Sequence, residues 1–272
     1  MSAEPKAEDL LRPFEGYRPG AVQGLKQFSF VPDEVRDRLA SLALDEDWGE
    51  NNFVLVKYLA VQVPLSLQQG RYTWFNNQLT LTAGTLQTRY GTPLYIIFER
   101  NERPDAAPWF MRIATDRPMA DELPQPANLP DWPDIALNSE IVIAHEHILD
   151  DNKSRVAFLE HTPPVAQMCA VAGAIQWSIH RRLYIPQLYW GTTSYFVPVY
   201  LTSREDITAA PDLVAPVQVQ PGYLVARTLL EPYMSYARAR VVAPRADQLP
   251  TWLVSAWRDH SQHVSEEEDE LA

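Results

Sequence analysis

Apolar residues recur every three or four positions in several parts of the chain, and this spacing predicts helices. The longest such pattern follows Pro164. Its apolar positions are Val165, Met168, Ala172, Ile175, Ile179 and Leu183. A second helix is expected from about Asn52 to Val63, because Pro64 should end or kink it. Shorter helices are expected over residues 33–42, 233–240 and 249–257.

Alternating residues and short apolar runs predict strands between these helices. Residues 72–81 are aromatic and alternating, and residues 93–99 form a continuous apolar run that suits a central strand. Further strands are expected over residues 109–114, 140–145, 195–201 and 223–230. This order predicts an α+β fold in a single domain, with a mostly antiparallel sheet and helices packed on one face.

Polar and proline-rich segments set the expected limits of that domain. Residues 1–24 are rich in Pro, Gly and charge, which predicts a flexible N-terminal arm. Residues 259–272 end in a run of acids and are expected to form an acidic disordered tail. We therefore expect the α+β domain over residues 25–258, with a proline-rich surface crossing over residues 118–133.

Composition narrows the class of protein. The formal net charge of −12 argues against a protein that coats duplex DNA by bulk electrostatics. Four arginines between residues 227 and 245 are nevertheless compatible with a local basic face. The single cysteine, Cys169, excludes an internal disulfide and suits a reducing compartment. No stretch has the pattern of a signal peptide or a membrane span. We expect a soluble, cytoplasmic protein that does not bind membranes.

The loop at residues 47–52 carries more polar chemistry than a helix start requires. Asn51 and Asn52 stand where the second helix should be capped, and Trp48 precedes Gly49. Because helix N-termini attract anions, we expect Trp48, Asn51 and Asn52 to bind a ligand. A doubly capped helix with Trp48 packed beside it explains the same residues without a ligand.

Two further segments hold residues suited to nucleic-acid bases. On the strand expected at 72–81, Trp74 and Asn76 would share one face, where the amide could read a base edge. A bulge or an edge-strand turn explains the asparagines equally well. At the end of the long helix, aromatic and polar groups alternate with cations as stacking and phosphate contacts require. The residues expected to bind a ligand there are Arg181, Arg182, Gln187 and Tyr189. Basic residues also favour helix C-termini without any ligand.

His145, His147 and Asp151 form the only metal-like set that we single out. Strand residues two apart share a face, so both imidazoles could reach one divalent metal ion, with the carboxylate completing the set. If the protein is an enzyme, the same three residues would be catalytic, either through the metal or as general acid and base. A strand end whose histidines bond the following turn is the structural alternative.

Several short motifs stand in a fixed order along the chain. They are Phe28-Ser-Phe-Val-Pro, Asp47-Trp-Gly-Glu-Asn-Asn, Trp74-Phe-Asn-Asn, Pro93-Leu-Tyr-Ile-Ile-Phe-Glu, His147-Ile-Leu-Asp-Asp-Asn and Ala237-Arg-Ala-Arg. With these motifs the chain resembles, over about residues 25–258, an uncharacterised domain-of-unknown-function family of bacteria and fungi, sometimes fused to OST-HTH (LOTUS) or cold-shock RNA-binding modules. The resemblance implies a role connected with RNA or nucleotides and supplies no catalytic residues.

Three functions remain open at this point. The first is an RNA- or nucleotide-binding protein with a role in nucleic-acid metabolism. The second is a metal-dependent or acid–base hydrolase that acts on phosphodiester or nucleotide bonds. The third is a protein–protein adaptor that uses the proline-rich middle and the acidic tail. The first accounts best for the Asn, Arg and aromatic content and for the family resemblance.

Overall fold

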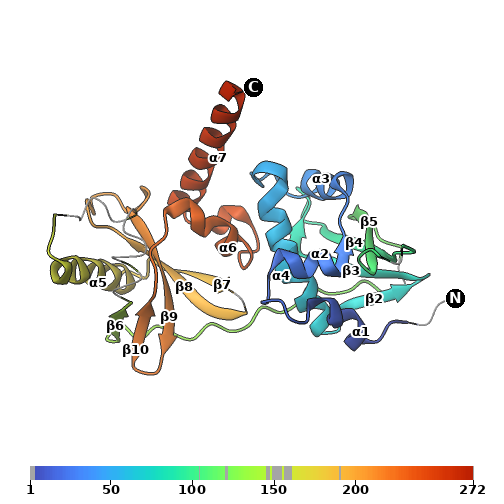
Figure 1. Cartoon of the computed structure of the whole chain (residues 1–272), viewed down its shortest axis with the longest axis horizontal. Coiled ribbons are helices and arrows are strands. Elements are labelled where there is room, and N and C mark those ends of the chain that lie inside the picture. Colours follow the sequence, from blue (N-terminus) through green and yellow to red (C-terminus); the bar gives the residue numbers. More distant parts are fainter. Residues whose placement is uncertain are drawn as a thin grey trace. The chain divides into compact units, whose positions relative to one another are not determined.

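Two five-stranded sheets form the framework of the computed structural model (Figure 1). The structure describes residues 4–103, 105–119, 122–144, 148, 155, 161–189 and 191–271, and the side chains of these up to residue 262. Its contacts divide the chain into two compact units, where we expected a single domain. Unit 1 comprises residues 1–129 and 244–246, and unit 2 comprises residues 130–243 and 247–272.

Unit 1 is drawn in blue to green in Figure 1, and its sheet has the strand order β1-β5-β4-β3-β2. The strands are β1 (Ser29–Phe30), β2 (Tyr72–Phe75), β3 (Gln78–Gln87), β4 (Pro93–Arg100) and β5 (Trp109–Thr115). β2 to β5 form an antiparallel meander, and β1 pairs in parallel with β5. The helices are α1 (Ala7–Leu11), α2 (Val22–Phe28), α3 (Asp33–Leu42) and α4 (Phe53–Gln68), with 3-10 turns η1 (Arg12–Phe14) and η2 (Glu50–Asn52).

Unit 2 is built on the sheet β6-β10-β9-β8-β7. Its strands are β6 (Glu140–Ile143), β7 (Ile185–Tyr189), β8 (Thr192–Val199), β9 (Leu213–Gln220) and β10 (Tyr223–Ala226). Among the described residues of unit 2, the helices are α5 (Pro164–His180), α6 (Tyr236–Arg240) and α7 (Thr251–Leu271), with 3-10 turns η5 (Pro232–Ser235) and η6 (Ala246–Gln248).

The two sheets share one topology. In each, four consecutive strands form an antiparallel meander, and a preceding first strand pairs in parallel with the last strand of that meander. One or more helices lie between the first strand and the meander: α3 and α4 in unit 1, α5 in unit 2. No repeat is visible in the amino-acid sequence, so this correspondence belongs to the fold alone.

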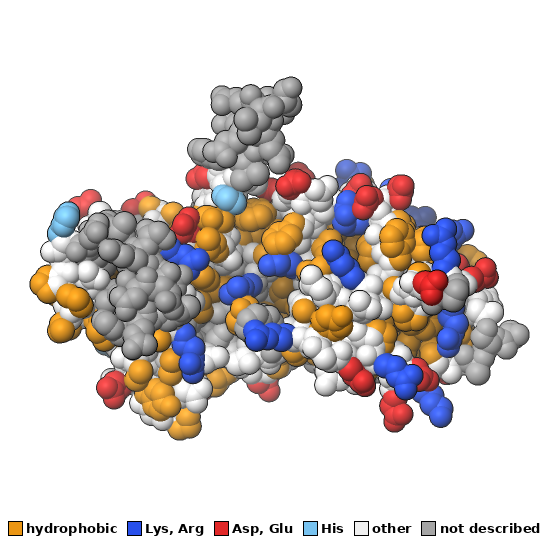
Figure 2. Space-filling view, in the orientation of Figure 1, with side chains coloured by type: hydrophobic (Ala, Val, Ile, Leu, Met, Phe, Trp, Pro, Cys, Tyr) orange, Lys and Arg blue, Asp and Glu red, His pale blue; other side chains and the backbone are white. Residues whose placement is uncertain are grey.

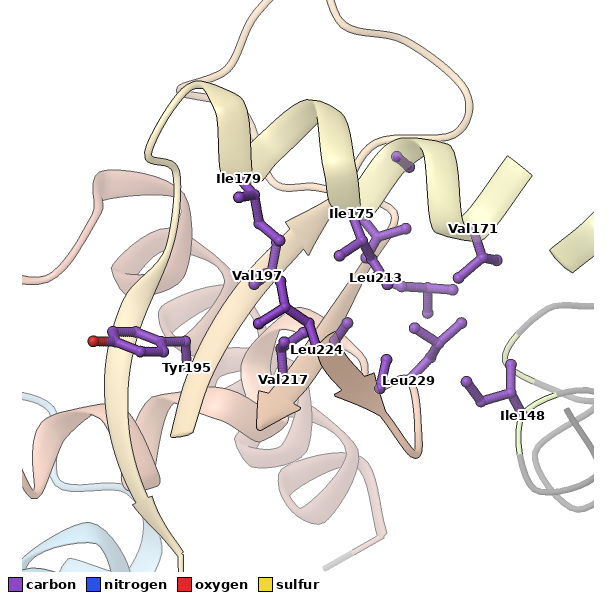
Figure 3. Close-up of a cluster of buried hydrophobic side chains, with 14 residues drawn as sticks. Ile148, Val171, Ile175, Ile179, Tyr195, Val197, Leu213, Val217, Leu224 and Leu229 are labelled. Atoms are coloured by element: carbon purple, nitrogen blue, oxygen red, sulfur yellow. The ribbon is translucent and has the colours of Figure 1, made fainter. Parts of the chain in front are cut away.

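The core of unit 2 lies between α5 and one face of its sheet (Figure 3). Val171, Ile175 and Ile179 of α5 point toward strand residues such as Val197 and Leu213, and all five are buried. Burying a side chain of this kind contributes about 1.5–3 kcal/mol to stability.

Helices lie on both faces of the second sheet, although the sequence indicated one face. Tyr195 and Val197 of β8 face α5, so the alternate residue Thr192 faces the other side. Tyr189 of β7 pairs with Thr192 and therefore lies on that side, where the Arg238 guanidinium of α6 covers its ring.

The α+β class, the mostly antiparallel sheets and both long helices are confirmed. α4, however, continues through Pro64 to Gln68. The proline removes one backbone hydrogen bond, but Val63 and Leu67 on either side of it are fully or almost fully buried, and their burial offsets that loss.

The two segments expected to be flexible contain helices. Within residues 1–24, α1 places Leu10 in the core with no exposed surface, and the Phe14 ring stacks on Phe28 at 5.2 Å. These closely spaced apolar residues outweigh the surrounding prolines and charges. At the other end, α7 runs through the acidic segment to Leu271. No helix in the described part of the chain is both long and apolar enough to span a membrane.

Candidate functional site

A hollow of about 620 Å³ opens on unit 1 where α2, β1, α3, α4, β5 and the loop between β4 and β5 meet. Its lining includes two aromatic rings, Phe30 and Phe110, and three cations, Lys26, Arg36 and Arg103. The volume lies within the range of about 300–1,000 Å³ typical of small-molecule sites. This hollow is the candidate site.

The aromatic wall of the hollow comes from the parallel pairing of β1 with β5. That pairing sets Phe30 beside Phe110, and their rings stack with centroids 5.7 Å apart and planes 26° apart. Phe30 is nevertheless 56% exposed. One face of its ring packs on Phe110, and the exposed remainder is available to a planar ligand.

The cations of the hollow differ in their pairing. The Arg36 guanidinium lies 2.9 Å from the Asp33 carboxylate and 3.3 Å from that of Asp37. Lys26 and Arg103 are exposed, and no acidic side chain among the described residues lies within 4.0 Å of either. Figure 2 shows Lys and Arg side chains next to exposed hydrophobic side chains on unit 1. The hollow therefore combines an exposed ring with two positive charges that lack a described counter-ion.

The Asn-rich loop is connected to this hollow through Asp37. The Asn52 side-chain amide donates to Asp37 Oδ1 at 2.8 Å, and the same oxygen accepts from the Arg36 guanidinium. The Asn51 amide donates to Glu50 Oε1 at 2.6 Å. Asn52 thus holds the Asp37 carboxylate, which in turn holds the Arg36 guanidinium at the wall of the hollow.

Asn52 occupies the N-cap position of α4, as the sequence indicated, but the alternative of a helix capped by both asparagine side chains is wrong. Both have left-handed backbones, with φ of 50° and 53°, and neither side chain caps the helix. Asparagine tolerates this conformation better than most residues. The two side-chain amides donate to Glu50 and Asp37. The N–H of Val54 donates instead to the carbonyl of Trp48. Trp48 itself is only 5% exposed and is a core residue of unit 1.

Asn76 lies at the tip of a hairpin and not on a strand face beside Trp74. Residues 72–81 form the whole of β2, a two-residue turn and the start of β3, with Phe75 paired to Gln78. Asn76 and Asn77 have φ of 50° and 63°, as the turn types that suit two-residue hairpins require, and both are exposed. Trp74 packs edge-on against Trp109.

The other predicted ligand residues belong to unit 2. Arg181 and Arg182 are exposed just beyond the end of α5, and the Arg181 guanidinium carbon lies 4.0 Å from the Trp177 ring centroid. Gln187 is 1% exposed and lies in the interior. The Tyr189 ring is covered by the Arg238 guanidinium at 4.1 Å. Burial lowers the pKa of Arg238, and its contact with Tyr189 opposes that change.

His145, His147 and Asp151, the predicted metal ligands, lie outside the described residues. Within the described part of the chain, no group of three or more His, Cys, Asp or Glu side chains is placed to hold a metal ion.

Sequence reasoning missed most of the hollow because its residues come from six separate parts of the chain. Lys26, Phe30, Arg36, Arg103 and Phe110 are each unremarkable beside their neighbours in the sequence. Only the run Phe28-Ser29-Phe30 gave a hint, since it places a buried ring at the end of α2 and an exposed ring on β1.

Comparison with known proteins identifies a family whose function is unknown. A family model described as a domain of unknown function (DUF3825) matches residues 39–249, well over half of the chain. Lys26, Phe30 and Arg36 precede the matched region, whereas Arg103 and Phe110 lie within it. No curated protein and no solved structure matches the chain.

Proposed function

The chain belongs to the DUF3825 family, and we propose that it binds a nucleotide, free or as part of single-stranded RNA, in the hollow of unit 1. The observation that carries this proposal is the exposed Phe30 ring, stacked on Phe110 in a hollow that is also lined by Lys26 and Arg103. The role in nucleic-acid metabolism follows from the ligand class.

In this proposal the base stacks on the exposed part of Phe30. Such stacking accepts any base, because every base has a π-face, and contributes about 1–3 kcal/mol per base. The phosphate oxygens accept hydrogen bonds from Lys26, which acts as a point charge, and from the planar fork of Arg103. Arg36 contributes less net charge, because two carboxylates already pair with it.

The combination of groups favours a nucleotide over simpler ligands. A purely apolar ligand would leave Lys26 and Arg103 without a role, and a simple anion would leave Phe30 without one. A nucleotide has both a flat aromatic surface and a phosphate, and the hollow offers partners for both. The hydrolase and adaptor hypotheses stay predictions, because the described contacts favour neither.

Titration of the full-length protein with AMP, UMP and a fluorescein-labelled 12-nucleotide RNA, by calorimetry and anisotropy, tests the proposal. We expect Phe30→Ala to weaken binding about tenfold, the loss of one stacked base. The K26A/R103A variant should weaken binding and reduce its dependence on salt. All three substituted side chains are exposed, so the fold should be unaffected.

The chain offers a matched control in Arg89 and Tyr90. The Arg89 guanidinium lies 4.8 Å from the Tyr90 ring centroid, and Tyr90 is 78% exposed, but neither residue lines the hollow. The R89A/Y90A variant should bind like the wild type. The proposal fails if this control loses as much affinity as the hollow variants, or if the wild type binds none of the three ligands at low salt.

A further inference from the structure

A second arrangement of cations on an aromatic ring lies in unit 2, at the last turn of α5. The guanidinium carbons of Arg181 and Arg204 lie 4.0 Å and 5.0 Å from the centroid of the Trp177 ring. Trp177 in turn packs edge-on against Tyr200 at 5.8 Å. Arg181 and Arg204 are both exposed.

Both guanidinium groups are held in place by the main chain. Arg181 Nη1 donates to the carbonyl of Trp177 at 3.2 Å, and Arg204 Nε donates to the carbonyl of Tyr200 at 3.2 Å. A guanidinium has five N–H donors, and these described bonds use one in each group. The remaining donors form fixed forks, so little side-chain entropy is lost when an anion binds.

The two cations also lack acidic partners in the part of the chain that the structure describes. Asp206 accepts hydrogen bonds from Thr208, and Asp212 accepts them from Thr202 and Leu201. Glu205, next to Arg204 in the sequence, is exposed and forms no described ion pair with it. Since both guanidinium groups contact one ring, they lie within about 10 Å of each other, which is about the Debye length at 0.1 M salt. Their mutual repulsion is therefore only partly screened, and a bound anion would relieve it.

We propose that Arg181 and Arg204, positioned by Trp177, form a second phosphate-binding site, in unit 2, that contacts the backbone of a single-stranded nucleic acid. This inference rests on the proposed function and narrows its ligand from a free nucleotide to a single strand with several phosphates. The site has no described hollow for a base, so it binds the backbone and not the sequence.

The number and geometry of the cations favour a phosphodiester chain over a membrane surface. Recognition of anionic lipid headgroups typically uses clusters of about four to eight Lys or Arg residues. Here two fixed planar forks match the oxygen atoms of individual phosphate groups.

Binding of the full-length protein to fluorescein-labelled oligo(U) of about 4 to 24 nucleotides, at several salt concentrations, tests the inference. In the R181A/R204A variant we expect UMP to bind as in the wild type and the longest oligomer to bind about tenfold more weakly. The slope of log K against log salt should fall by about 1.4, since each phosphate contact to a single strand contributes about 0.7. The R227A/R258A variant, which removes two exposed charges elsewhere in unit 2, should keep the wild-type slope.

Two results would overturn the inference. In the first, the wild type binds UMP and oligomers, but R181A/R204A and R227A/R258A give the same affinity and slope; the proposed function then stands and the second site does not. In the second, Arg181 and Arg204 are needed for binding to phosphatidylserine vesicles and not for binding to RNA. If the wild type binds neither UMP nor oligomers, the proposed function itself fails.

Discussion

At the scale of single residues, Gly84 is the position in β3 with the least tolerance for a side chain. Its φ is +58°, and it lies where the pairing of β3 with β4 shifts register. A Cβ atom there would overlap the Tyr58 hydroxyl, which accepts from the N–H of Thr85 at 2.7 Å, and would press on Gln62. We expect Gly84→Ala to lower the free energy of unfolding by about 2–4 kcal/mol, from backbone strain and a disturbed, partly buried hydrogen bond.

Gly70 provides the matched control for that prediction. Its φ is +65°, but nothing lies within 4 Å of the Cβ atom that alanine would add. Gly70→Ala should therefore cost only the strain of a left-handed alanine, about 1 kcal/mol. Urea unfolding of both variants separates the two effects, and equal losses would show that the contact with Tyr58 costs nothing.

At the scale of elements, α5 ends in a Schellman motif that contains arginine where glycine is usual. The N–H of Leu183 donates to the Ser178 carbonyl and that of Arg182 to the Ile179 carbonyl, while Arg182 has φ of +56°. Arg182→Gly should raise the free energy of unfolding by about 0.5–1 kcal/mol, because relief of strain exceeds the entropy that glycine adds to the unfolded chain.

Arg182→Ala serves as the control in thermal unfolding. Alanine removes the same charge but keeps the Cβ atom and its strain, so the melting temperature should stay near that of the wild type. A gain in Arg182→Ala equal to that in Arg182→Gly would attribute the effect to charge and contradict the backbone explanation.

Local spacing predicts helices and strands well where one face is buried, as in α4 and α5. It failed at Asn76-Asn77, since an alternating aromatic pattern continues through the hairpin and hides the turn. It also failed for α1, which depends on burying Leu10 in unit 1 and not on its own periodicity. The hollow escaped prediction because its walls are joined by the long-range pairing of Phe30 with Phe110, which no local pattern encodes.

At the scale of the whole molecule, net charge and the proposed site together favour single strands over duplexes. The formal net charge of −12 opposes the approach of any polyanion, so binding depends on the few local cations and on stacking. A duplex hides the base faces that Phe30 would contact. At 150 mM salt we expect a single-stranded oligomer to bind at least about tenfold more tightly than a duplex of the same sequence. Competition anisotropy with unlabelled strands measures the ratio of the two affinities. Equal affinities would show that Phe30 does not stack on a base.

The shared topology of the two sheets affects the order in which the strands can pair while the protein is being translated. In each unit the first strand must await a partner about 80 residues later, since Ser29 pairs with Trp109 and Glu140 with Tyr223. At elongation rates of about 5–20 residues per second, that interval lasts roughly 4–16 s. Each meander can assemble from neighbouring hairpins as it emerges from the ribosome. The strand that precedes it, β1 or β6, stays unpaired until the last strand of the meander has been synthesised. The chain therefore passes through two such waiting periods, one per sheet, and these are the stages at which a nascent-chain chaperone would have most to protect.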